Sequence, residues 1–428
     1  MNLTSEQSAF VDRVLIGGIG SIVLSSAGGC GKSFVIEHIA RLLRDKKRKA
    51  VIMAPTNKAK DVLIKNGIPE VKTIHSFLRS KKVVDEDGKQ TYELSKPDIK
   101  GFDLFIDECS MINDSMFAIF ELLSKDNFII YVGDHHQLPP IVENDKSVRS
   151  KVFDSGYESF AFTKNMRSKK LSSTVMLEMA RRHAEKGCMP PSINSMNMEE
   201  ILPYFDDDGD SIIICYTNLK VKHYNQKVRS YLFCADESKL EPFYIGETLV
   251  FKGWRYTNGQ AYTSGSTIKI SQLLKVDIPM NYQECDCNKT TDMARKLCRK
   301  HKFRFGEVKL TFHLIVATDG SEWFIPREST IKEFNLLADQ YHAWCKLQKS
   351  KLKWEEYLAW KDKYNSDLRY RYASTFHSSQ GSQWQNVFVD RLNLVRCCKD
   401  DLLLKVCGYY TGISRHIKEV YDIEYQDN

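Results

Sequence analysis

Apolar runs of strand length recur along residues 1–170. They lie at Ser21–Leu24, Ala50–Met53, Phe102–Ile106 and Phe128–Val132, and continuous apolar character is typical of strands that are buried on both faces of a parallel sheet. After the first run, Ser33–Leu43 carries its apolar residues at helical spacing. This alternation of strand and helix predicts an α/β fold built from βαβ units.

Two further runs, at Ser211–Cys215 and Asn386–Val389, predict a second α/β lobe. Between them, residues 246–326 are rich in Thr, Tyr and Gly with alternating apolar positions, which predicts a small antiparallel β-barrel. Residues 328–366 have a helical pattern with many Trp and Lys residues. In the first lobe, Lys82–Glu93 has β-prone arms around an Asp-Gly pair, which predicts an inserted β-hairpin.

A glycine-rich segment stands between the first predicted strand and the first predicted helix. Its residues are Ser26, Ala27, Gly28, Gly29, Cys30, Gly31, Lys32 and Ser33. Glycines let several backbone N–H groups wrap around one phosphate, and the helix N-terminus adds partial positive charge. In such a loop Lys32 reaches the β- and γ-phosphates, and the Ser33 hydroxyl ligates Mg²⁺. Ser26 replaces the first glycine of the usual pattern, and the alternative interpretation is a glycine-rich surface turn.

An acidic pair, Asp107 and Glu108, directly follows the predicted strand Phe102–Ile106. At the carboxyl end of a strand next to the phosphate-binding loop, Asp107 can hold Mg²⁺ through its water shell. Glu108 can orient or deprotonate the attacking water. An isolated acidic pair at a strand end is often structural, but together with the loop it predicts hydrolysis of a nucleoside triphosphate.

Composition adds only broad constraints. Among 428 residues, 62 Lys and Arg against 55 Asp and Glu give a net charge of +7, which permits a polyanionic partner without demonstrating one. No apolar run reaches the roughly 18–20 residues that cross a bilayer, and the first residues lack the pattern of a signal peptide. The 12 cysteines are therefore expected to be reduced thiols in a cytosol-like compartment.

Eight motifs beside the phosphate-binding loop occur in the order found in superfamily 1 helicases. They are Leu3-Thr4-x-x-Gln7, APTNKA at Ala54–Ala59, TIHS at Thr73–Ser76, DECS at Asp107–Ser110, GDHHQLPP at Gly133–Pro140, KNMRS at Lys164–Ser168, STFHSSQG at Ser374–Gly381 and YTGISR at Tyr410–Arg415. From Leu3 to Arg415 the chain resembles this superfamily, and within it the RecD-like, 5′-to-3′ group with the Dda-like helicases of T-even phages. The ordered set carries the resemblance, because any one motif is weak.

The resemblance implies roles for four further residues of the nucleotide site. Gln7 would read the adenine edge, and Gln137 would sense the γ-phosphate and couple it to movement. Arg167 and Arg415, one from each lobe, resemble arginine fingers, because a planar guanidinium stabilises the charge that spreads over a transferred phosphoryl group. The alternative for either arginine is a surface salt bridge.

The resemblance also implies a track for a single strand across both lobes, with polar contacts to the backbone and bases stacked on aromatic rings. The candidates are Pro55, Thr56, Thr73, His75 and Ser76 in the first lobe and Thr375 and His377 in the second. The repeated Thr-x-His-Ser pattern favours DNA contact over the alternative of structural histidines. Closure of the cleft on ATP would then move one lobe along the strand.

The predicted hairpin occupies the position of the pin that splits the duplex in this family. Tyr92 is the candidate that stacks on the last base pair, and a structural tyrosine is the equal alternative. Trp360 is a candidate for stacking on the strand, although aromatic residues at helical spacing more often belong to the core. A group of Cys and His residues does not have a standard zinc spacing: Cys285, Cys287, Cys298 and His301.

The expected architecture is two RecA-like P-loop motor lobes, each interrupted by an insertion. Lobe 1A comprises residues 1–79 and 97–170, with the hairpin pin 1B at 80–96. Lobe 2A comprises residues 171–245 and 371–428. Its insertions are a Src-homology-3-like β-barrel 2B at 246–326 and a helical arm at 327–370.

We therefore expect an ATP- and Mg²⁺-dependent, 5′-to-3′ single-stranded DNA translocase and DNA helicase that acts in replication or recombination. Its substrates would be single-stranded DNA and junctions of single- and double-stranded DNA, with single-strand-binding or replication and recombination proteins as candidate partners. The chain would be a cytoplasmic monomer without membrane contact, in the host cytoplasm if phage-encoded. Two alternatives stay open: an RNA helicase with the same motor, and a RecD-like nucleic-acid-binding subunit of a larger complex.

Overall fold

A computed structural model describes residues 3–78, 81–84, 90–140, 146–166, 171–192, 194–205, 210–253, 255–257, 260–281, 307–348 and 351–424. The chain divides into two compact units, Met1–Leu240 with Arg371–Asn428 and Glu241–Tyr370. The first unit contains two parallel sheets, here called the first and second lobe. Among its described residues, the second unit contains an antiparallel sheet, a separate β-hairpin and two helices.

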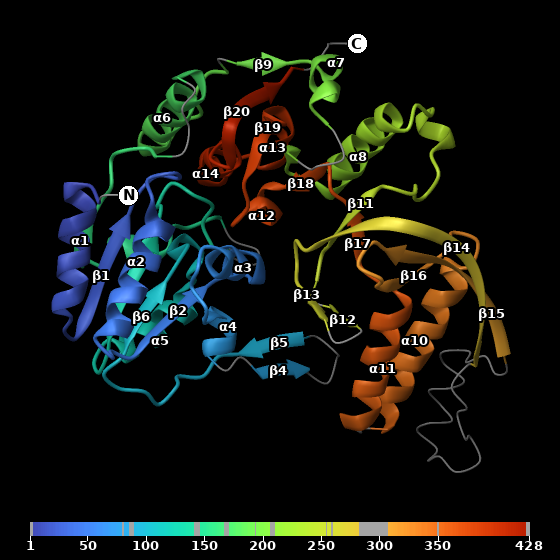
Figure 1. The fold of residues 1–428 in the computed structure, drawn as a ribbon, viewed down its shortest axis with the longest axis horizontal. Helices are drawn as coiled ribbons and strands as arrows, with labels where there is room; N and C mark the ends of the chain where they lie inside the picture. Colours follow the sequence, from blue (N-terminus) through green and yellow to red (C-terminus); the bar gives the residue numbers. More distant parts are fainter. Residues whose placement is uncertain are drawn as a thin grey trace. The chain divides into compact units, whose positions relative to one another are not determined.

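The first lobe is built on a six-stranded parallel sheet of order β3-β2-β6-β7-β1-β8. The central strands β6 and β7 are buried along their whole length, as the continuous apolar runs predicted. The strands are β1 (Gly20–Ser25), β2 (Ala50–Ala54), β3 (Val71–Thr73), β6 (Asp103–Ile106), β7 (Phe128–Gly133) and β8 (Glu158–Phe160) (Figure 1).

Helices cover both faces of this sheet, because successive strand residues point to opposite sides. Ile130 packs with residues of α1, α2 and α3, whereas its neighbour Ile129 packs with residues of α4 and α5. Thr4 starts α1 with a capping box, and Thr56 and Asn113 cap α3 and α5. The helices are α1 (Ser5–Ile16), α2 (Lys32–Asp45), α3 (Asn57–Lys65), α4 (Ile74–Phe77) and α5 (Asp114–Leu123), with 3₁₀ helices at Cys109–Met111 and Lys151–Asp154.

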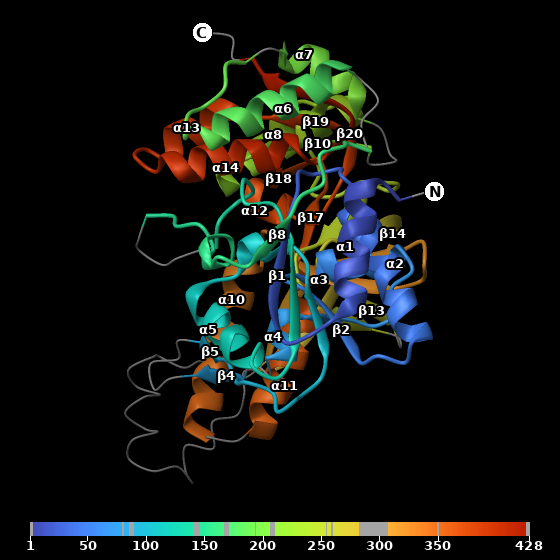
Figure 2. The same ribbon diagram turned by 90° about the vertical axis from the view of Figure 1, so that its left-hand side faces the viewer.

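The second lobe is built on a five-stranded parallel sheet of order β18-β10-β19-β20-β9 (Figure 2). Its strands are β9 (Ser195–Met196), β10 (Ser211–Cys215), β18 (Ala373–Thr375), β19 (Trp384–Val389) and β20 (His416–Ile423). Residues of α6, α13 and α14 pack with Ile212, Ile214 and Val389 in one core. The helices are α6 (Leu171–Glu185), α7 (Met198–Ile201), α8 (Asn218–Leu232), α12 (Phe376–Ser379), α13 (Arg391–Cys397) and α14 (Leu402–Ile413), with 3₁₀ helices at Leu202–Tyr204 and Glu237–Lys239.

The second unit is an antiparallel sheet of order β16-β15-β14-β11-β17, with a separate β12-β13 hairpin. Its core contains Trp323, whose ring lies edge-on to the rings of Phe251 and Tyr262. The sequence did not predict β17. The elements are β11 (Thr248–Phe251), β12 (Arg255–Thr257), β13 (Gln260–Tyr262), β14 (Thr267–Asn281), β15 (Glu307–Ala317), β16 (Glu322–Pro326), α10 (Ile331–Gln348), α11 (Lys351–Tyr364) and β17 (Leu368–Tyr370).

The predicted hairpin in the first unit is present as β4 (Lys81–Val84) and β5 (Gln90–Glu93), which pair antiparallel. The two parallel sheets and the helices that flank them confirm the predicted α/β fold. In the part of the chain that the structure describes, no helix is long and apolar enough to cross a membrane.

Candidate nucleotide-binding site

A pocket of about 220 Å³ opens where the phosphate-binding loop faces the second lobe. The first lobe supplies most of its lining, from the loop, α2, α3, the acidic pair and the segment after β7. The second lobe supplies Gly381, Gln383, Ser414 and Arg415. Residues far apart in the sequence therefore meet at one site, and the first-lobe contributors are Gly28, Gly29, Gly31, Lys32, Ser33, Phe34, Ala59, Val62, Asn66, Asp107, Glu108, Gln137 and Met166.

The phosphate-binding loop joins β1 to α2, as the sequence predicted. Gly29 and Gly31 have φ values of +87° and +84°, which residues with a Cβ rarely adopt. A Cβ at Gly31 would also lie 2.9 Å from Gln7 Nε2. Lys32 begins α2, and its Nζ donates hydrogen bonds to the carbonyls of Ser26 (2.7 Å) and Ala27 (2.9 Å). The loop thus places an ammonium group beside a helix N-terminus.

Ser26, the departure from the usual glycine, is completely buried and does not line the pocket. Its Oγ accepts a hydrogen bond of 2.7 Å from the backbone N–H of Phe162. The side chain therefore ties the loop to the segment that follows β8. Cys30 is also buried, and Met166 N–H donates to the Gly29 carbonyl at 2.8 Å.

Asp107 and Glu108 follow β6 and both line the pocket. Burial, and after it the adjacent Glu108 carboxylate, raises the pKa of Asp107 above its usual range, while the Lys32 charge acts in the opposite direction. Glu108 has a left-handed backbone with φ +50°, which is strained for a residue with a side chain. This conformation belongs to the turn that carries the acidic pair into the pocket.

Gln137 and Arg415 reach the pocket from opposite lobes. Arg415 is only 5% exposed. Its Nε donates to the Thr411 carbonyl at 3.1 Å, and its guanidinium lies 3.7 Å from Glu108 Oε1. The second lobe therefore delivers a buried guanidinium to the acidic pair of the first lobe.

The donor set fits a magnesium nucleotide. Oxygen donors on Ser33 and Asp107 are the ligand type that Mg²⁺ prefers, and Lys32 and Arg415 supply positive charge for phosphates. Among the described residues, Glu108 Oε2 and Gln137 Oε1 are buried without a hydrogen-bond partner. Buried polar atoms normally have partners, so two acceptors on pocket-lining side chains are consistent with a polar occupant.

Gln7 is buried directly behind the loop rather than in the pocket lining. Its Nε2 donates to the Cys30 carbonyl at 3.3 Å, and its Oε1 accepts from Thr4 N–H at 3.1 Å. Arg167, the other predicted arginine finger, lies outside the described residues.

The two Thr-x-His-Ser repeats have the same local structure. Each follows a parallel strand, and its threonine caps a four-residue helix, α4 in the first lobe and α12 in the second. Thr73 Oγ1 accepts from Ser76 N–H at 3.1 Å, and Thr375 Oγ1 accepts from Ser378 N–H at 3.2 Å. Thr56, after Pro55, caps α3 in the same manner. Desolvation lowers the pKa of both His75 and His377 from the ordinary value of histidine.

The other candidates for nucleic-acid contact, Trp360 and Tyr92, lie in elements outside the two parallel sheets. Trp360 of α11 stacks on Phe334 of α10 at 5.2 Å between ring centroids and 13° between planes, which favours the core alternative. Tyr92 lies in β5 opposite Lys82, and its side chain is outside the described part. The cysteine and histidine group at 285–301 also lies outside it.

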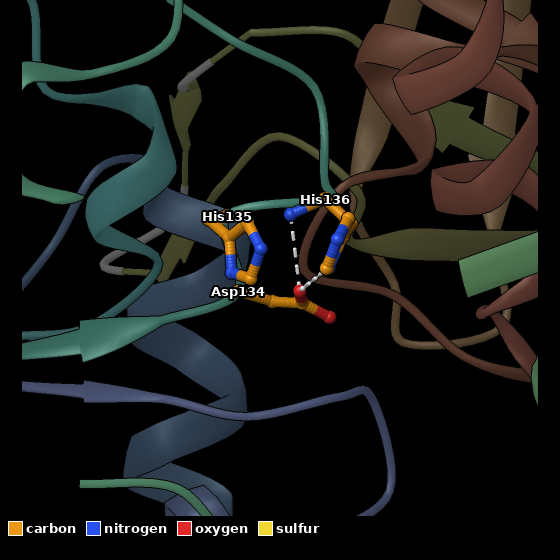
Figure 3. Close-up of side chains that lie close together, drawn as sticks. All are labelled: Asp134, His135 and His136. Carbon is orange, nitrogen blue, oxygen red and sulfur yellow. Dashed lines mark hydrogen bonds and ion pairs between the residues drawn. The ribbon is translucent and has the colours of Figure 1, made fainter. Parts of the chain in front are cut away.

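Asp134, His135 and His136, after β7, place ligand-type atoms within 4.8 Å of one another (Figure 3). Asp134 Oδ1 lies 3.1 Å from the His136 backbone N and 3.5 Å from its Nδ1. The positive charge of Lys32 interacts with Asp134, and the positive charges of Arg149 and Arg181 interact with His135. Positive charge from three side chains disfavours a metal cation here.

Asp134 instead joins the two lobes. Its Oδ2 accepts a hydrogen bond of 2.6 Å from the Tyr410 hydroxyl of α14. Burial opposes its ionisation, but His136, the Lys32 charge and the Tyr410 hydroxyl together hold the pKa of Asp134 below its usual range. A second bond runs from Leu138 N–H to Thr411 Oγ1 at 2.9 Å.

Sequence reasoning missed several pocket residues. Ser414 stands next to Arg415 in a recognised motif, so the motif itself was the signal for it. Gly381 and Gln383 lie at and just after the end of another motif. Val62 and Asn66 gave no signal, because the sequence of a helix does not show which neighbour its exposed face meets.

Comparisons with known proteins agree with this geometry. Residues 18–143 match the family described as AAA domain. The ATP-dependent DNA helicase dda of Enterobacteria phage T4 is 23% identical over 438 residues, covering 94% of this chain and 93% of that protein. The ATP-dependent DNA helicase Pif1 of Campylobacter jejuni is 25% identical over 242 residues, covering 50% and 52%. The crystal structure of the Candida albicans Pif1 helicase has a TM-score of 0.51 at 15% identity, covering 100% of this chain and 96% of that one.

The fold and the site define a P-loop protein with two stacked α/β lobes and a nucleotide pocket between them. With the ordered motifs and the sequence matches above, the chain is similar to superfamily 1 helicases of the Dda and Pif1 group.

Proposed function

We propose that this chain is an ATP-dependent DNA helicase that translocates 5′-to-3′ along single-stranded DNA. The observation that carries the proposal is the pocket in which Lys32, Glu108 and Gln137 of the first lobe face Arg415 of the second. A hydrolytic site completed by the second lobe depends on the distance between the lobes. Hydrolysis is thereby linked to their relative movement.

Each residue that the sequence assigned to the nucleotide site has a proposed task. ATP supplies the phosphoryl group; the Ser33 hydroxyl and the Asp107 carboxylate would hold Mg²⁺, which would neutralise phosphate charge when bound. Glu108 orients the attacking water and accepts its proton. Lys32 and Arg415 stabilise the negative charge of the transferred group, and Arg167 is proposed to add a second guanidinium. Gln137 contacts the γ-phosphate, and Gln7, which was predicted to read the adenine edge, supports the loop from behind the pocket.

In both lobes, candidates for the strand track are near neighbours in sequence of residues that line the pocket. Thr56 caps α3, the helix that supplies Ala59, Val62 and Asn66 to the pocket. Thr375 caps α12, and the pocket residues Gly381 and Gln383 follow that helix. Closure of the pocket would therefore shift the two capped turns relative to each other, and with them the strand.

The insertions would convert stepping into unwinding. The β4–β5 hairpin is proposed as the pin, with Tyr92 against the last base pair of the duplex. The sheet of the second unit is proposed as the Src-homology-3-like barrel, and α10 with α11 as the helical arm, within the domain limits given above. Junctions of single- and double-stranded DNA would then be the substrate.

ATP hydrolysis by the purified chain, with and without single-stranded DNA, tests the proposal. We expect DNA to stimulate hydrolysis, and Glu108→Gln to lower kcat by about a hundredfold or more, since it removes the base that accepts the proton. Lys32→Ala should abolish hydrolysis while the chain still binds single strands. Glu70→Gln, on an exposed site of the same lobe, is the matched control. Stimulation by RNA alone, or an unaffected Glu108→Gln variant, would contradict the proposal.

A further inference from the structure

Lys58 is a cation of the first lobe that contacts the second lobe. It lies in the first turn of α3, and its Nζ donates to the Ser378 carbonyl of α12 at 3.4 Å. The same ammonium lies 5.2 Å from the ring centroid of Trp384, at the start of β19, within the range of a cation–π contact. Both partners belong to the second lobe, so these contacts exist only when the lobes meet.

The contact lies between the proposed strand track and the nucleotide pocket. On one side of Lys58 in the sequence is Thr56, a track candidate, and on the other is Ala59, which lines the pocket. Ala59 packs against Gly381 so closely that a Cβ on Gly381 would lie 3.2 Å from the Ala59 backbone N. The lobes therefore meet closely beside Lys58, so its ammonium group lies at the contact between them.

The surroundings of Lys58 disfavour its charge. Burial, and after it the Arg415 charge, lowers the pKa of Lys58 to about 8. Arg415 has a carboxylate partner in Glu108 at 3.7 Å, whereas the described contacts of Lys58 are a carbonyl and an aromatic ring. At neutral pH the lysine stays charged, so closing the lobes places a desolvated cation near a second cation.

We propose that Lys58 makes closure of the nucleotide pocket depend on bound single-stranded nucleic acid, whose backbone phosphate beside Thr56 and Ser378 supplies the negative charge that Lys58 lacks. The inference rests on the proposed function and adds to it the residue that senses the strand. Without a strand, the Lys58 charge opposes closure and keeps hydrolysis slow. With a strand, the phosphate removes this opposition, because lysine binds phosphate as a point charge.

Substitution of Lys58 separates this role from a structural one. Lys58→Met keeps the length of the side chain but removes its charge, so we expect DNA-free hydrolysis to rise and the stimulation by oligothymidine to fall by roughly tenfold, a typical size for coupling between two sites. Lys58→Arg keeps the charge and should retain most of the stimulation. Lys65→Met, at the exposed end of the same helix, is the matched control and should behave as the unaltered chain.

Binding gives a second readout that does not depend on hydrolysis. Loss of one phosphate contact in Lys58→Met should reduce the slope of log affinity for oligothymidine against log salt by about 0.7. If Lys58→Met lowers both hydrolysis rates equally, or leaves the stimulation and the salt slope as in Lys65→Met, the inference is wrong. If the unaltered chain shows no stimulation by DNA, the proposed function itself fails, which is a different result.

Discussion

Ser26 shows how one hydroxyl can replace a glycine without loss of the loop. Glycine at the start of such loops gives conformational freedom, but here the side chain turns away from the pocket and accepts the Phe162 N–H at 2.7 Å. The hydroxyl thereby satisfies a backbone donor in the interior of the first lobe. The substitution leaves every group that faces the nucleotide in place.

Ser26→Ala therefore has a defined cost. The variant leaves the Phe162 N–H buried without its acceptor, so we expect the free energy of unfolding to fall by about 1–3 kcal/mol. Denaturant unfolding of the two chains measures the difference. Ser124→Ala, whose half-buried hydroxyl donates to the Glu121 carbonyl of its own helix, is the control and should cost less. An equal loss of free energy of unfolding in both variants would show that the Ser26 hydrogen bond stabilises the chain no more than the Ser124 bond does.

At the residue scale, the catalytic groups of the pocket were easier to predict from the sequence than the contacts that hold them in place. Lys32, Asp107 and Glu108 were predicted because phosphate binding and water activation demand particular groups at fixed places in a strand–loop–helix unit. The partner of Ser26 could not be predicted, because Phe162 is 136 positions away and contributes only a backbone N–H. Lys58 looked like an ordinary helix lysine until its contacts with Ser378 and Trp384 placed it between lobes.

At the element scale, α14 is joined to the segment after β7 by two hydrogen bonds. Tyr410 donates to Asp134, and Leu138 donates to Thr411. Gln137 lies between Asp134 and Leu138, and α14 leads directly to Arg415. The two bonds therefore fix the distance between the residue that contacts the γ-phosphate and the guanidinium that stabilises it, in the proposed assignment of roles.

Tyr410→Phe tests this connection. It removes the hydroxyl that donates to a buried carboxylate, so we expect the free energy of unfolding to fall by about 1–3 kcal/mol, together with a lower kcat for DNA-stimulated hydrolysis. Tyr231→Phe, with an exposed tyrosine of α8, should change stability by less than about 0.5 kcal/mol. Unchanged hydrolysis in Tyr410→Phe would show that the two bonds do not position Arg415.

The β4–β5 hairpin gives a prediction for unwinding. If the hairpin splits the duplex, Tyr92→Ala should slow strand separation by about fivefold or more, since a stacked base contributes roughly 1–3 kcal/mol, while translocation on single strands stays fast. Rates are compared on a forked duplex and on a single strand with an end label. Thr91→Ala, the neighbour of Tyr92 in β5, controls for damage to the hairpin. Equal losses in unwinding and translocation would exclude a role as the pin.

Long or chemically marked elements were predicted well, and short ones were not. The parallel strands followed from continuous apolar runs, and the start of α2 followed from the glycine-rich segment before it. In contrast, β17 has only three residues and pairs with β11, which lies more than a hundred positions earlier. Strand pairing at such distance depends on the tertiary fold rather than on local sequence.

At the scale of the whole molecule, the net charge of +7 takes on a specific meaning. A motor must grip and release its track, and each neutralised phosphate adds affinity and salt dependence. A modest excess of positive charge suits this cycle better than a strongly basic surface would. In the proposal above, the cation that matters most, Lys58, lies where the lobes meet rather than on an open face.

The direction of unwinding tests the central claim most directly. A DNA duplex with a 5′ single-stranded tail, the same duplex with a 3′ tail, and RNA counterparts of both are incubated with the chain and ATP, and strand separation is measured. We predict unwinding of the 5′-tailed DNA that requires ATP and is abolished in Glu108→Gln. Unwinding only from the 3′ tail, only on RNA, or at the same rate without ATP would contradict the account.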